Sequence, residues 1–329
     1  MRRRAFITLL GGAAVAYPLA THAQQSGRVP HVMIWVGGGA GDVEPQKRAA
    51  AFRDALRELG WVDGRNARID PRWTDDPLRV TAADAAELIA LKPDVIVTTG
   101  APILALLHRQ TKAIPIVFTL VTDPVTDGFV ASLASPGGNV TGFTIFEHSF
   151  AGKWLEMLKE AVPAMTRVAV MQNPDHPAWN AYLRAIGAVA SGMGVEVTPA
   201  PVNNPGEIEA AISAFGSTPN GGLVILPSGV STAHRMVAAN AALRHRLPSI
   251  ASLRAYAESG GLMSYGVVTA EPYRQAATYV DRILKGAKPG ELPVQASSKF
   301  ETVINLKTAN ALGITVPATM LGRADEVIE

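Results

Sequence analysis

The order of apolar segments along the chain constrains its fold more than any other feature. Short apolar runs alternate with longer segments whose apolar residues have helical spacing. In residues 46–59, for example, Phe52, Leu56 and Leu59 recur at intervals of four and three residues. That spacing predicts an amphipathic helix, and Gly60 predicts its end. Strands and helices that alternate with short links predict an α/β architecture, with parallel sheets covered by helices on both faces.

The same pattern predicts elements along the whole chain. Strands are expected at 31–36, 66–73, 94–99, 115–120, 140–145, 167–171, 195–198, 223–226, 249–252, 262–265 and 301–306. Helices are expected at 46–59, 81–91, 103–110, 153–160, 179–191, 205–215, 232–245 and 272–284. The run D-V-I-V-T-T at 94–99 has a continuous apolar centre, which is typical of a strand buried on both faces.

A weak internal repeat predicts two similar lobes. Residues 94–120 and 222–252 each contain a strand, a polar loop, a helix, a basic residue, a proline and a second strand. Ligands of open α/β sheets bind beyond the carboxyl ends of the strands, so two lobes with facing strand ends would form a binding cleft. Its expected lining loops are 37–41, 100–102, 122–124, 173–175, 228–231 and 265–266.

The N-terminal segment 1–23 is typical of a secretory signal peptide. It has three arginines at 2–4, an apolar stretch at 6–20 interrupted by glycines and a proline, and a small residue, Ala23, suited to cleavage. Two of the arginines also match part of a twin-arginine export signal. An uncleaved membrane anchor is the alternative, although the stretch is short for one. We expect cleavage near Ala23 and a soluble mature protein in the periplasm.

The chain contains no cysteine. This excludes disulfides, cysteine nucleophiles, zinc sites built from cysteine and a lipid-modified cysteine at the mature N-terminus. An exported protein of this kind is expected to diffuse freely in a bacterial periplasm. The formal net charge is +2 and there is no long basic run, which argues against nucleic acid as a partner.

Sequence patterns for catalysis, metals and cofactors are absent. The seven histidines include no pair at metal-ligand spacing, so no metal is expected. The glycine-rich loop 37–41 lacks the third glycine of a dinucleotide-binding motif, because Asp42 occupies that position, and no cofactor is expected. Ser228 lies six residues before His234, but no G-x-S-x-G motif accompanies it. We therefore expect a protein that is not an enzyme.

Two carboxylates that follow apolar strands are candidate ligand-binding groups. Asp123 occurs in V-T-D-P and Asp175 in N-P-D, and from a cleft each can bind a ligand ammonium group. The alternative is that each caps the following helix through a side-chain oxygen. Thr122 and Asn173 offer neutral hydrogen bonds from the same loops, and Tyr265 can stack on a ring.

The remaining candidates are small residues at expected strand ends. Gly38 and Gly39 either form a tight turn between strand and helix or offer backbone N–H groups to a ligand carboxylate. Gly100 and Ala101 follow one buried strand, and Ser228 follows another. All are placed in the expected cleft by the position of their loops.

Seven stretches of the sequence resemble a known family. They are A-F-R-D-A-L-R-E-L-G-W-V-D-G-R-N, P-I-V-F-T-L-V-T-D-P-V, L-A-S-P-G-G-N-V-T-G, R-V-A-V-M-Q-N-P-D, A-E-S-G-G-L-M-S-Y-G, Y-V-D-R-I-L-K-G-A-K-P-G-E-L-P-V and K-F-E-T-V-I-N-L-K-T-A-N-A-L-G. Together they resemble the ABC-transporter substrate-binding proteins of the tryptophan/tyrosine-uptake type, from about residue 30 to the C-terminus. The stretches occur in the family's order.

The resemblance implies a type I periplasmic binding protein fold, with two Rossmann-like lobes, a multi-strand hinge and a ligand in the cleft. The implied first lobe is 28–143 plus 261–293, and the second is 144–260 plus 294–329. The cleft positions that lie in matching motifs are Gly100, Thr122, Asp123, Asn173, Asp175 and Tyr265. Ser228 departs from the family, which often has aspartate there, and the loop 37–42 is richer in glycine than usual.

The function implied is capture of a small organic ligand, an amino acid or an aromatic compound, by a monomeric periplasmic protein that closes about its hinge. Delivery to an ABC permease in the inner membrane is implied as well. Two alternatives remain open. One is an exported sensory domain, whose lobes would look the same, and the other is an exported α/β hydrolase, which the missing catalytic pattern opposes.

Overall fold

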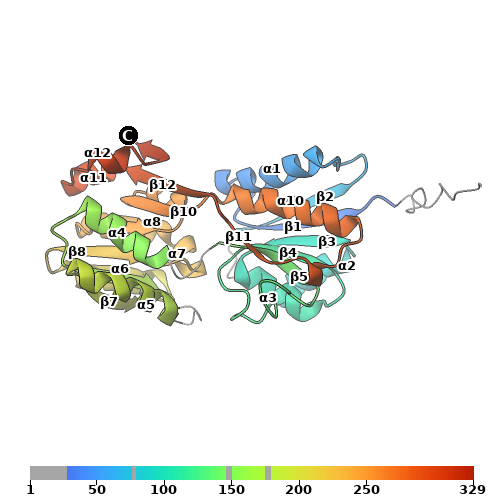
Figure 1. Ribbon diagram of the computed structural model, residues 1–329, viewed down its shortest axis with the longest axis horizontal. Coiled ribbons are helices and arrows are strands. Elements are labelled where there is room, and N and C mark those ends of the chain that lie inside the picture. The colour runs from blue at the N-terminus through green and yellow to red at the C-terminus, as the bar shows by residue number, and fades with distance from the viewer. Residues whose placement is uncertain (1–27, 76–78, 146–149, 175–178) are drawn as a thin grey trace, which may run out of the picture.

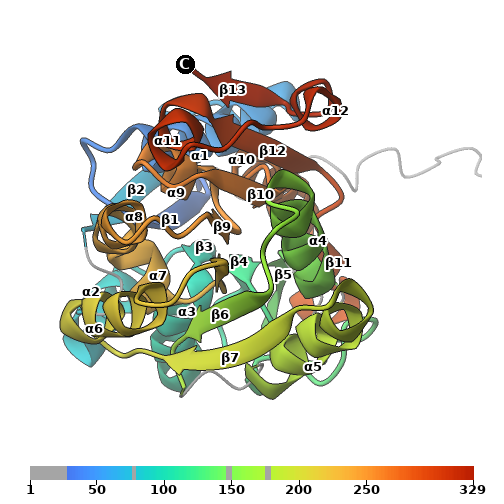
Figure 2. The same ribbon diagram turned by 90° about the vertical axis from the view of Figure 1, so that its left-hand side faces the viewer.

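The computed structural model describes residues 28–75, 79–145, 150–174 and 179–329. The expected signal peptide therefore lies outside the described residues. Within them, the strands form two sheets, and helices pack around each sheet (Figure 1). We call the body around the first sheet the first lobe and the body around the second sheet the second lobe. Figure 2 views the second lobe from its far end, with the first lobe behind it.

The first lobe contains most of the N-terminal half of the chain and two later segments. Its strands are β1 (His31–Gly37), β2 (Arg68–Thr74), β3 (Val95–Thr99), β4 (Ile116–Val121), β5 (Val140–Thr144) and β11 (Gln295–Ala296). Its helices are α1 (Val43–Glu58), α2 (Ala82–Ala90), α3 (Gly100–Gln110) and α10 (Ala270–Leu284). The strand order is β11-β5-β4-β3-β1-β2, and every adjacent pair is parallel.

Helices cover both faces of the first sheet, as the continuous apolar strands predict. On one face α1 and α10 bury Phe52, Leu56 and Tyr273 against β1, β3, β4 and β5. On the other face α2 and α3 bury Leu88 and Leu104 against the same strands. Helices thus cover both faces of the sheet, and the ends of its strands stay uncovered.

The second lobe follows the same plan. Its strands are β6 (Arg167–Gln172), β7 (Glu196–Pro201), β8 (Gly221–Ile225), β9 (Ser249–Ala251), β10 (Met263–Val267), β12 (Phe300–Asn305) and β13 (Glu326–Ile328). Its helices are α4 (Ala151–Ala161), α5 (Trp179–Ala190), α6 (Pro205–Gly216), α7 (Gly229–Ala233), α8 (Arg235–Arg244), α9 (Arg254–Glu258), α11 (Leu306–Leu312) and α12 (Ala318–Leu321). The strand order is β13-β12-β10-β9-β8-β6-β7. Helices α4 and α5 cover one face, and α6, α8 and α9 cover the other.

The alternating pattern predicts these elements well. Each expected strand is present, with bounds shifted by at most three residues, and the α/β class is confirmed. The helix expected at 232–245 is instead two helices, because a Ser228 cap starts α7 early and His234, with φ −106°, separates it from α8. Strands β11 and β13 and helices α9, α11 and α12 are not predicted by the sequence pattern.

The expectation that all strands are parallel is wrong at one place in the second sheet. β12 runs antiparallel to β10. The reason is the path of the chain, since β12 enters the second lobe directly from β11 of the first lobe, after a three-residue link. It therefore starts at the side of the second sheet nearest the first lobe and runs away from it, whereas the parallel strands run toward it.

Strand pairing also revises the two expected lobe boundaries. The resemblance implies 261–293 in the first lobe, yet β10 pairs with β9 and β12 in the second sheet. It implies 294–329 in the second lobe, yet β11 pairs with β5 in the first. The chain completes each strand before it crosses, so the crossovers fall after β5, β10 and β11. Movement of the two lobes as rigid units stays a prediction.

In the described part of the chain, every helix is too short or too polar to cross a membrane.

Candidate functional site

The three crossovers show which edges of the two sheets face each other. β5 runs parallel to the other strands of the first sheet, and its carboxyl end leads into α4 of the second lobe. β10 runs parallel to β9, and its carboxyl end leads within three residues into α10 of the first lobe. The carboxyl ends of both sheets therefore point toward the space between the lobes (Figure 1). Ligands of parallel α/β sheets bind at such edges.

A backbone irregularity shapes this edge of the first sheet. The register of β4 against β5 shifts between Thr119 and Val121, and Leu120 has a left-handed φ of 55°. A non-glycine residue in this conformation costs about 1–3 kcal/mol. The Leu120 side chain packs against the cores of both lobes. The bulge thus carries the following residues, Thr122 and Asp123, to the point where the lobes meet.

Asp123 has a local structural role, and its binding of a ligand ammonium group stays a prediction. Its Oδ1 accepts a hydrogen bond from the backbone N–H of Thr126 at 3.0 Å, which fixes a turn rather than a helix. The carboxylate also acts across the lobes on Tyr182 of α5. Burial raises the pKa of Tyr182, and the charge of Asp123 raises it further. Asp123 therefore lies close to the second lobe. Thr122 is held beside it, since its carbonyl accepts from the hydroxyl of Thr144 at 2.8 Å.

A second carboxylate, Asp127, lies on the same turn. Burial raises its pKa to about 6, and the neighbouring charge of Asp123 adds to the effect. Two carboxylates this close disfavour each other's ionisation unless a cation lies between them. The turn that follows β4 therefore holds two carboxylates whose negative charges disfavour each other.

Replacement of Asp127 by asparagine should stabilise the protein at neutral pH. The folded pKa of about 6 lies above the ordinary 3.8, so the folded state binds more protons than the unfolded state between these values. The free energy of unfolding of the wild type therefore falls as pH rises from about 4 to 6. D127N should be about 1–2 kcal/mol more stable than the wild type at pH 7 and equal to it near pH 4. Urea unfolding at both pH values measures this, and a difference independent of pH would refute it.

The loop after β1 uses its backbone groups within the protein. The N–H of Gly38 donates to the Thr74 carbonyl at 2.7 Å, and the N–H of Gly39 donates to Oδ2 of Asp42 at 3.0 Å. These bonds favour the tight-turn interpretation over binding of a ligand carboxylate. A Cβ at Gly39 would lie 2.8 Å from Oδ1 of Asp75. The carboxylates of Asp42 and Asp75 thus also lie at this edge of the first sheet.

Gly100 and Ala101 begin α3 directly after β3. Gly100 has a left-handed φ of 73°, which lets the chain turn from strand to helix without an intervening loop. The hydroxyl of the preceding Thr99 forms a hydrogen bond with the hydroxyl of Tyr273 of α10. Both candidates are partly buried at the carboxyl edge, as the sequence predicts.

The second lobe contributes Gln172 and Asn173 at the end of β6. Asn173 is partly buried, while Gln172 is fully buried. Asp175, the other candidate carboxylate, lies outside the described residues. Ser228 caps α7, since its Oγ accepts from the N–H of Ser231 at 3.1 Å and its own N–H donates to Oγ of Ser231 at 3.0 Å. The capping role accounts for serine at this position.

A small cavity lies at the carboxyl ends of β8 and β9. Its volume is about 20 Å³, and its polar lining includes Ser231, Thr232, Arg235 and Ser252. Such a volume accommodates about one water molecule and no organic ligand. It places Arg235 at the carboxyl-end edge of the second sheet.

Tyr265 does not belong with the other candidates. Its side chain lies on the α4 face of the second sheet, where its ring stacks on Phe300 with centroids 5.8 Å apart. Together with Lys153, Glu160 and Arg323 it lines a separate cavity of about 130 Å³ between α4, β12 and α12. The sequence motif located the strand but not the face to which the ring points.

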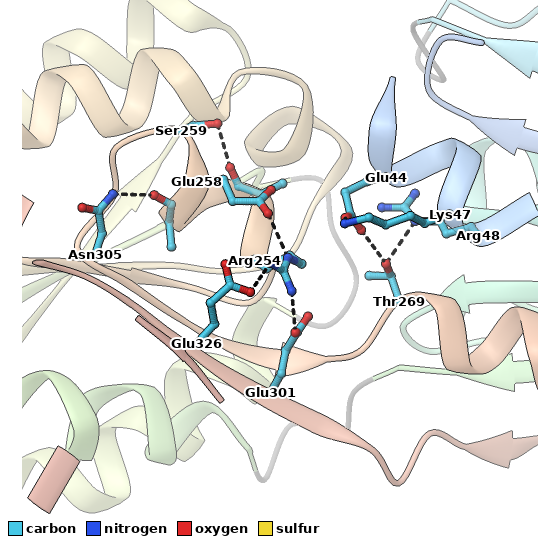
Figure 3. A network of polar contacts seen from close by, with 12 residues as sticks. Glu44, Lys47, Arg48, Arg254, Glu258, Ser259, Thr269, Glu301, Asn305 and Glu326 are labelled. Carbon is cyan, nitrogen blue, oxygen red and sulfur yellow. Dashed lines mark hydrogen bonds and ion pairs between the residues drawn. The ribbon is translucent and has the colours of Figure 1, made fainter. Parts of the chain in front are cut away.

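Two groups of polar contacts lie beside the crossover from β10 to α10, one in each lobe (Figure 3). The hydroxyl of Thr269 accepts from Nε of Arg48 at 3.2 Å and lies 3.4 Å from a carboxylate oxygen of Glu44. On the second-lobe side, Arg254 binds Glu258, Glu301 and Glu326 at 2.9, 3.0 and 2.6 Å.

The network also contains a repulsion between the lobes. Burial raises the pKa of Glu301; Arg254 opposes this, whereas the charge of Glu44 from the other lobe adds to it. The negative charges of Glu44 in the first lobe and Glu301 in the second thus repel each other.

Histidine, aspartate and glutamate residues form no cluster able to hold a metal ion within 28–75, 79–145, 150–174 and 179–329. The residues that sequence reasoning missed are Asp127, Gln172 and Tyr182. Asp127 has a sequence signal, because it follows Asp123 by four residues in a turn. Gln172 stands out by its burial, and Tyr182 by its burial and its closeness to Asp123 of the other lobe, which no local pattern reports.

Comparison with known proteins defines the class to which this site belongs. The sequence profile of the family described as ABC transporter substrate binding protein matches residues 44–328. The chain belongs to this family, whose members bind solutes. A tyrosine-binding protein from Clostridioides difficile (strain R20291) is 27% identical over 266 residues, which cover 81% of this chain and 76% of that protein.

Solved structures agree with the fold. A conserved domain protein from Vibrio cholerae has a TM-score of 0.81 at 27% identity and covers 91% of this chain and 100% of its own. An ABC domain from Streptococcus pneumonia, in complex with L-Trp, has the same TM-score at 24% identity and covers 92% of this chain and 100% of its own. The fold is that of the type I periplasmic binding proteins, as the resemblance implies.

Proposed function

We propose that this protein is the periplasmic substrate-binding component of an ABC importer and that it binds an aromatic amino acid between its lobes. The observation that carries the proposal is the acidic edge of the first sheet, where Asp123 lies within electrostatic reach of Tyr182 in the second lobe. A carboxylate at this position suits a ligand ammonium group, because charge-assisted hydrogen bonds are about twice as strong as neutral ones. The relative named as tyrosine-binding supports an aromatic ligand.

The protein acts by closure rather than by chemistry. Three crossovers connect the lobes, and a ligand that contacts both edges stabilises the arrangement in which they approach each other. The ligand shifts this balance only through contacts that differ between open and closed forms. A permease in the inner membrane then recognises the closed form. No covalent bond is made or broken.

Export precedes this role. The segment 1–23 directs the chain across the inner membrane and is cleaved near Ala23, so the mature protein acts in the periplasm. We infer a monomer, because both edges that form the site come from one chain.

A thermal-shift screen of amino acids, aromatic acids and nucleobases tests the proposal. L-tyrosine or L-tryptophan at 100 times its dissociation constant should add about 2.7 kcal/mol to the free energy of unfolding. Aromatic acids that lack an ammonium group should give no shift. A screen in which such acids stabilise the protein and amino acids do not would contradict the role given to Asp123.

A further inference from the structure

Backbone hydrogen bonds on the two sides of Val268 show where the crossover from β10 to α10 changes lobe. The N–H of Val268 donates to the carbonyl oxygen of Lys299 at 3.0 Å, which extends the antiparallel pairing of β10 with β12 in the second lobe. The carbonyl oxygen of Val268 accepts from the N–H of Glu271 at 2.9 Å, in the first turn of α10 in the first lobe. The φ and ψ angles of Val268 therefore separate a bond to one lobe from a bond to the other.

The next residue, Thr269, belongs to the first lobe. It is 4% exposed, and its hydroxyl accepts from Nε of Arg48 at 3.2 Å and lies 3.4 Å from a carboxylate oxygen of Glu44, both in α1 (Figure 3). Helix α1 also packs along α10 in the core of the first lobe. A change in the angle between the lobes would therefore carry Thr269 along with the first lobe and fall on Val268.

The crossover from β11 to β12, which passes between the lobes in Figure 1, has a similar layout. The N–H of Ser297 donates to the carbonyl oxygen of Thr144 at 3.0 Å, which continues the pairing of β11 with β5 in the first lobe. The carbonyl oxygen of Lys299 accepts from Val268 in the second lobe. The exposed residue Ser298 is the centre of the backbone between these two bonds. Since Lys299 is bonded to Val268, the two places where the chain changes lobe lie side by side.

Aromatic packing holds together the second-lobe ends of all three crossovers. Phe150 precedes α4, Tyr265 lies in β10, and Phe300 begins β12. The ring of Phe300 has its centroid 4.6 Å from that of Phe150 and 5.8 Å from that of Tyr265. In addition, Nε1 of Trp154 in α4 donates to the carbonyl oxygen of Tyr265 at 2.7 Å. Bending at these aromatic residues would disrupt this packing, whereas bending at Val268 and Ser298 leaves it intact.

We propose that Val268 and Ser298 are the hinge residues about which the two lobes turn. A hinge consists of a few residues whose φ and ψ angles absorb the rotation of the bodies that they join. Rotation at these two residues keeps the bonds from Val268 to Lys299 and Glu271, and from Ser297 to Thr144. The lobes then turn without a loss of backbone hydrogen bonds. That this hinge serves ligand-driven closure rests on the proposed function.

Glycine at both hinge positions tests the proposal without any ligand. Ala86→Cys on α2 and Ser213→Cys on α6 provide one exposed site for a spin label in each lobe, and the natural chain has no cysteine. Pulsed electron paramagnetic resonance then measures the distribution of distances between the two labels. Val268→Gly/Ser298→Gly should about double the width of this distribution, because glycine adopts backbone angles that valine and serine avoid.

Gln295→Gly/Thr302→Gly is the matched control, with one exposed and one half-buried residue replaced on the two sides of the crossovers. Both residues lie in paired strands, Gln295 opposite Phe143 in the first sheet and Thr302 opposite Tyr265 in the second. The control should leave the width unchanged. Ser298→Gly alone, at an exposed position, should also broaden the distribution, and it replaces the double variant if that protein does not fold. No broadening by the hinge variants, or equal broadening by the control, would refute the location of the hinge.

Addition of L-tyrosine or L-tryptophan to the labelled protein tests the proposed function separately. A shorter mean distance with ligand, in a protein whose glycine variants are broadened without it, supports closure about this hinge. If the ligand shortens the distance but the hinge variants are not broadened, the proposed function stands and the hinge lies elsewhere. If the hinge variants are broadened and no amino acid changes the distance, the location of the hinge stands and its role in closure on an aromatic amino acid is refuted.

Discussion

The Asp123→Asn variant should bind L-tyrosine or L-tryptophan with a free energy less favourable by roughly 1.5–3 kcal/mol, the usual contribution of a hydrogen bond to a charged group. This corresponds to a dissociation constant raised about tenfold to a hundredfold or slightly more. The carboxylate lies where the lobes meet, and asparagine keeps its shape but not its charge. Titration calorimetry of both proteins measures the change. Stability without ligand should change little, because the asparagine oxygen can still accept from the N–H of Thr126.

Asp63→Asn is the matched control for this variant. Asp63 belongs to the same lobe and also accepts from a backbone N–H, that of Ile69 at 2.8 Å, but it precedes β2 and lies at the opposite edge of the sheet. It should leave binding unchanged. Unchanged or tighter binding by Asp123→Asn would mean that the ligand carries no ammonium group. A loss of several kcal/mol in stability without ligand would mean that Asp123 is structural.

Gly142→Ala should destabilise the protein by about 3 kcal/mol or more, through overpacking and backbone strain in the middle of the first sheet. Gly142 is the residue of β5 that pairs with Phe118 of β4. A Cβ there would lie 2.1 Å from the carbonyl oxygen and 2.7 Å from the nitrogen of Phe118, far closer than atoms can approach. Neither backbone atom can move without breaking the pairing of the two strands. Chemical denaturation monitored by circular dichroism measures the loss.

Gly138→Ala provides the comparison, four residues earlier in the chain. Gly138 is exposed, has no atom within 4 Å of the position of a Cβ and has no left-handed φ. It should be tolerated with a change within about 0.5 kcal/mol. Equal stability of Gly142→Ala and the wild type would show that β4 and β5 do not pair closely at Phe118.

The sequence predicts the architecture because the signals for it are local. Strands such as 94–99 are apolar runs of the right length, and the helices between them have regular apolar spacing, so their alternation defines the class of fold. The lobe boundaries depend instead on pairing between distant segments. No local sequence pattern near residue 263 indicates that β10 pairs with β9 and β12, or that β12 runs antiparallel to β10.

For the candidate site, too, the sequence predicts local features and misses those that depend on the folded structure. Position at a strand end is a local property, and it places Thr122, Asp123 and Asn173 just after β4 and β6, where their binding of a ligand stays a prediction. Local hydrogen bonds, in contrast, engage Ser228 in a helix cap and the N–H of Gly39 with Asp42. Strand-end position gives no information about which atoms are already bonded within the protein.

Side-chain direction and burial account for what the sequence could not supply. Tyr265 lies in a strand that was expected, but its ring points to the α4 face and into a separate cavity. Tyr182 lies close to Asp123 of the other lobe, and the two lobes fold from separate parts of the chain. The perturbed pKa of Asp127 likewise depends on burial in the folded turn.

Calorimetric titration of the purified wild-type protein with L-tyrosine, L-tryptophan and L-phenylalanine tests the central claim most directly. We predict saturable binding of at least one of them at a single site per chain, with a micromolar or tighter dissociation constant. No saturable heat with any of the three, from a protein that unfolds cooperatively, would contradict the claim that the cleft binds an aromatic amino acid.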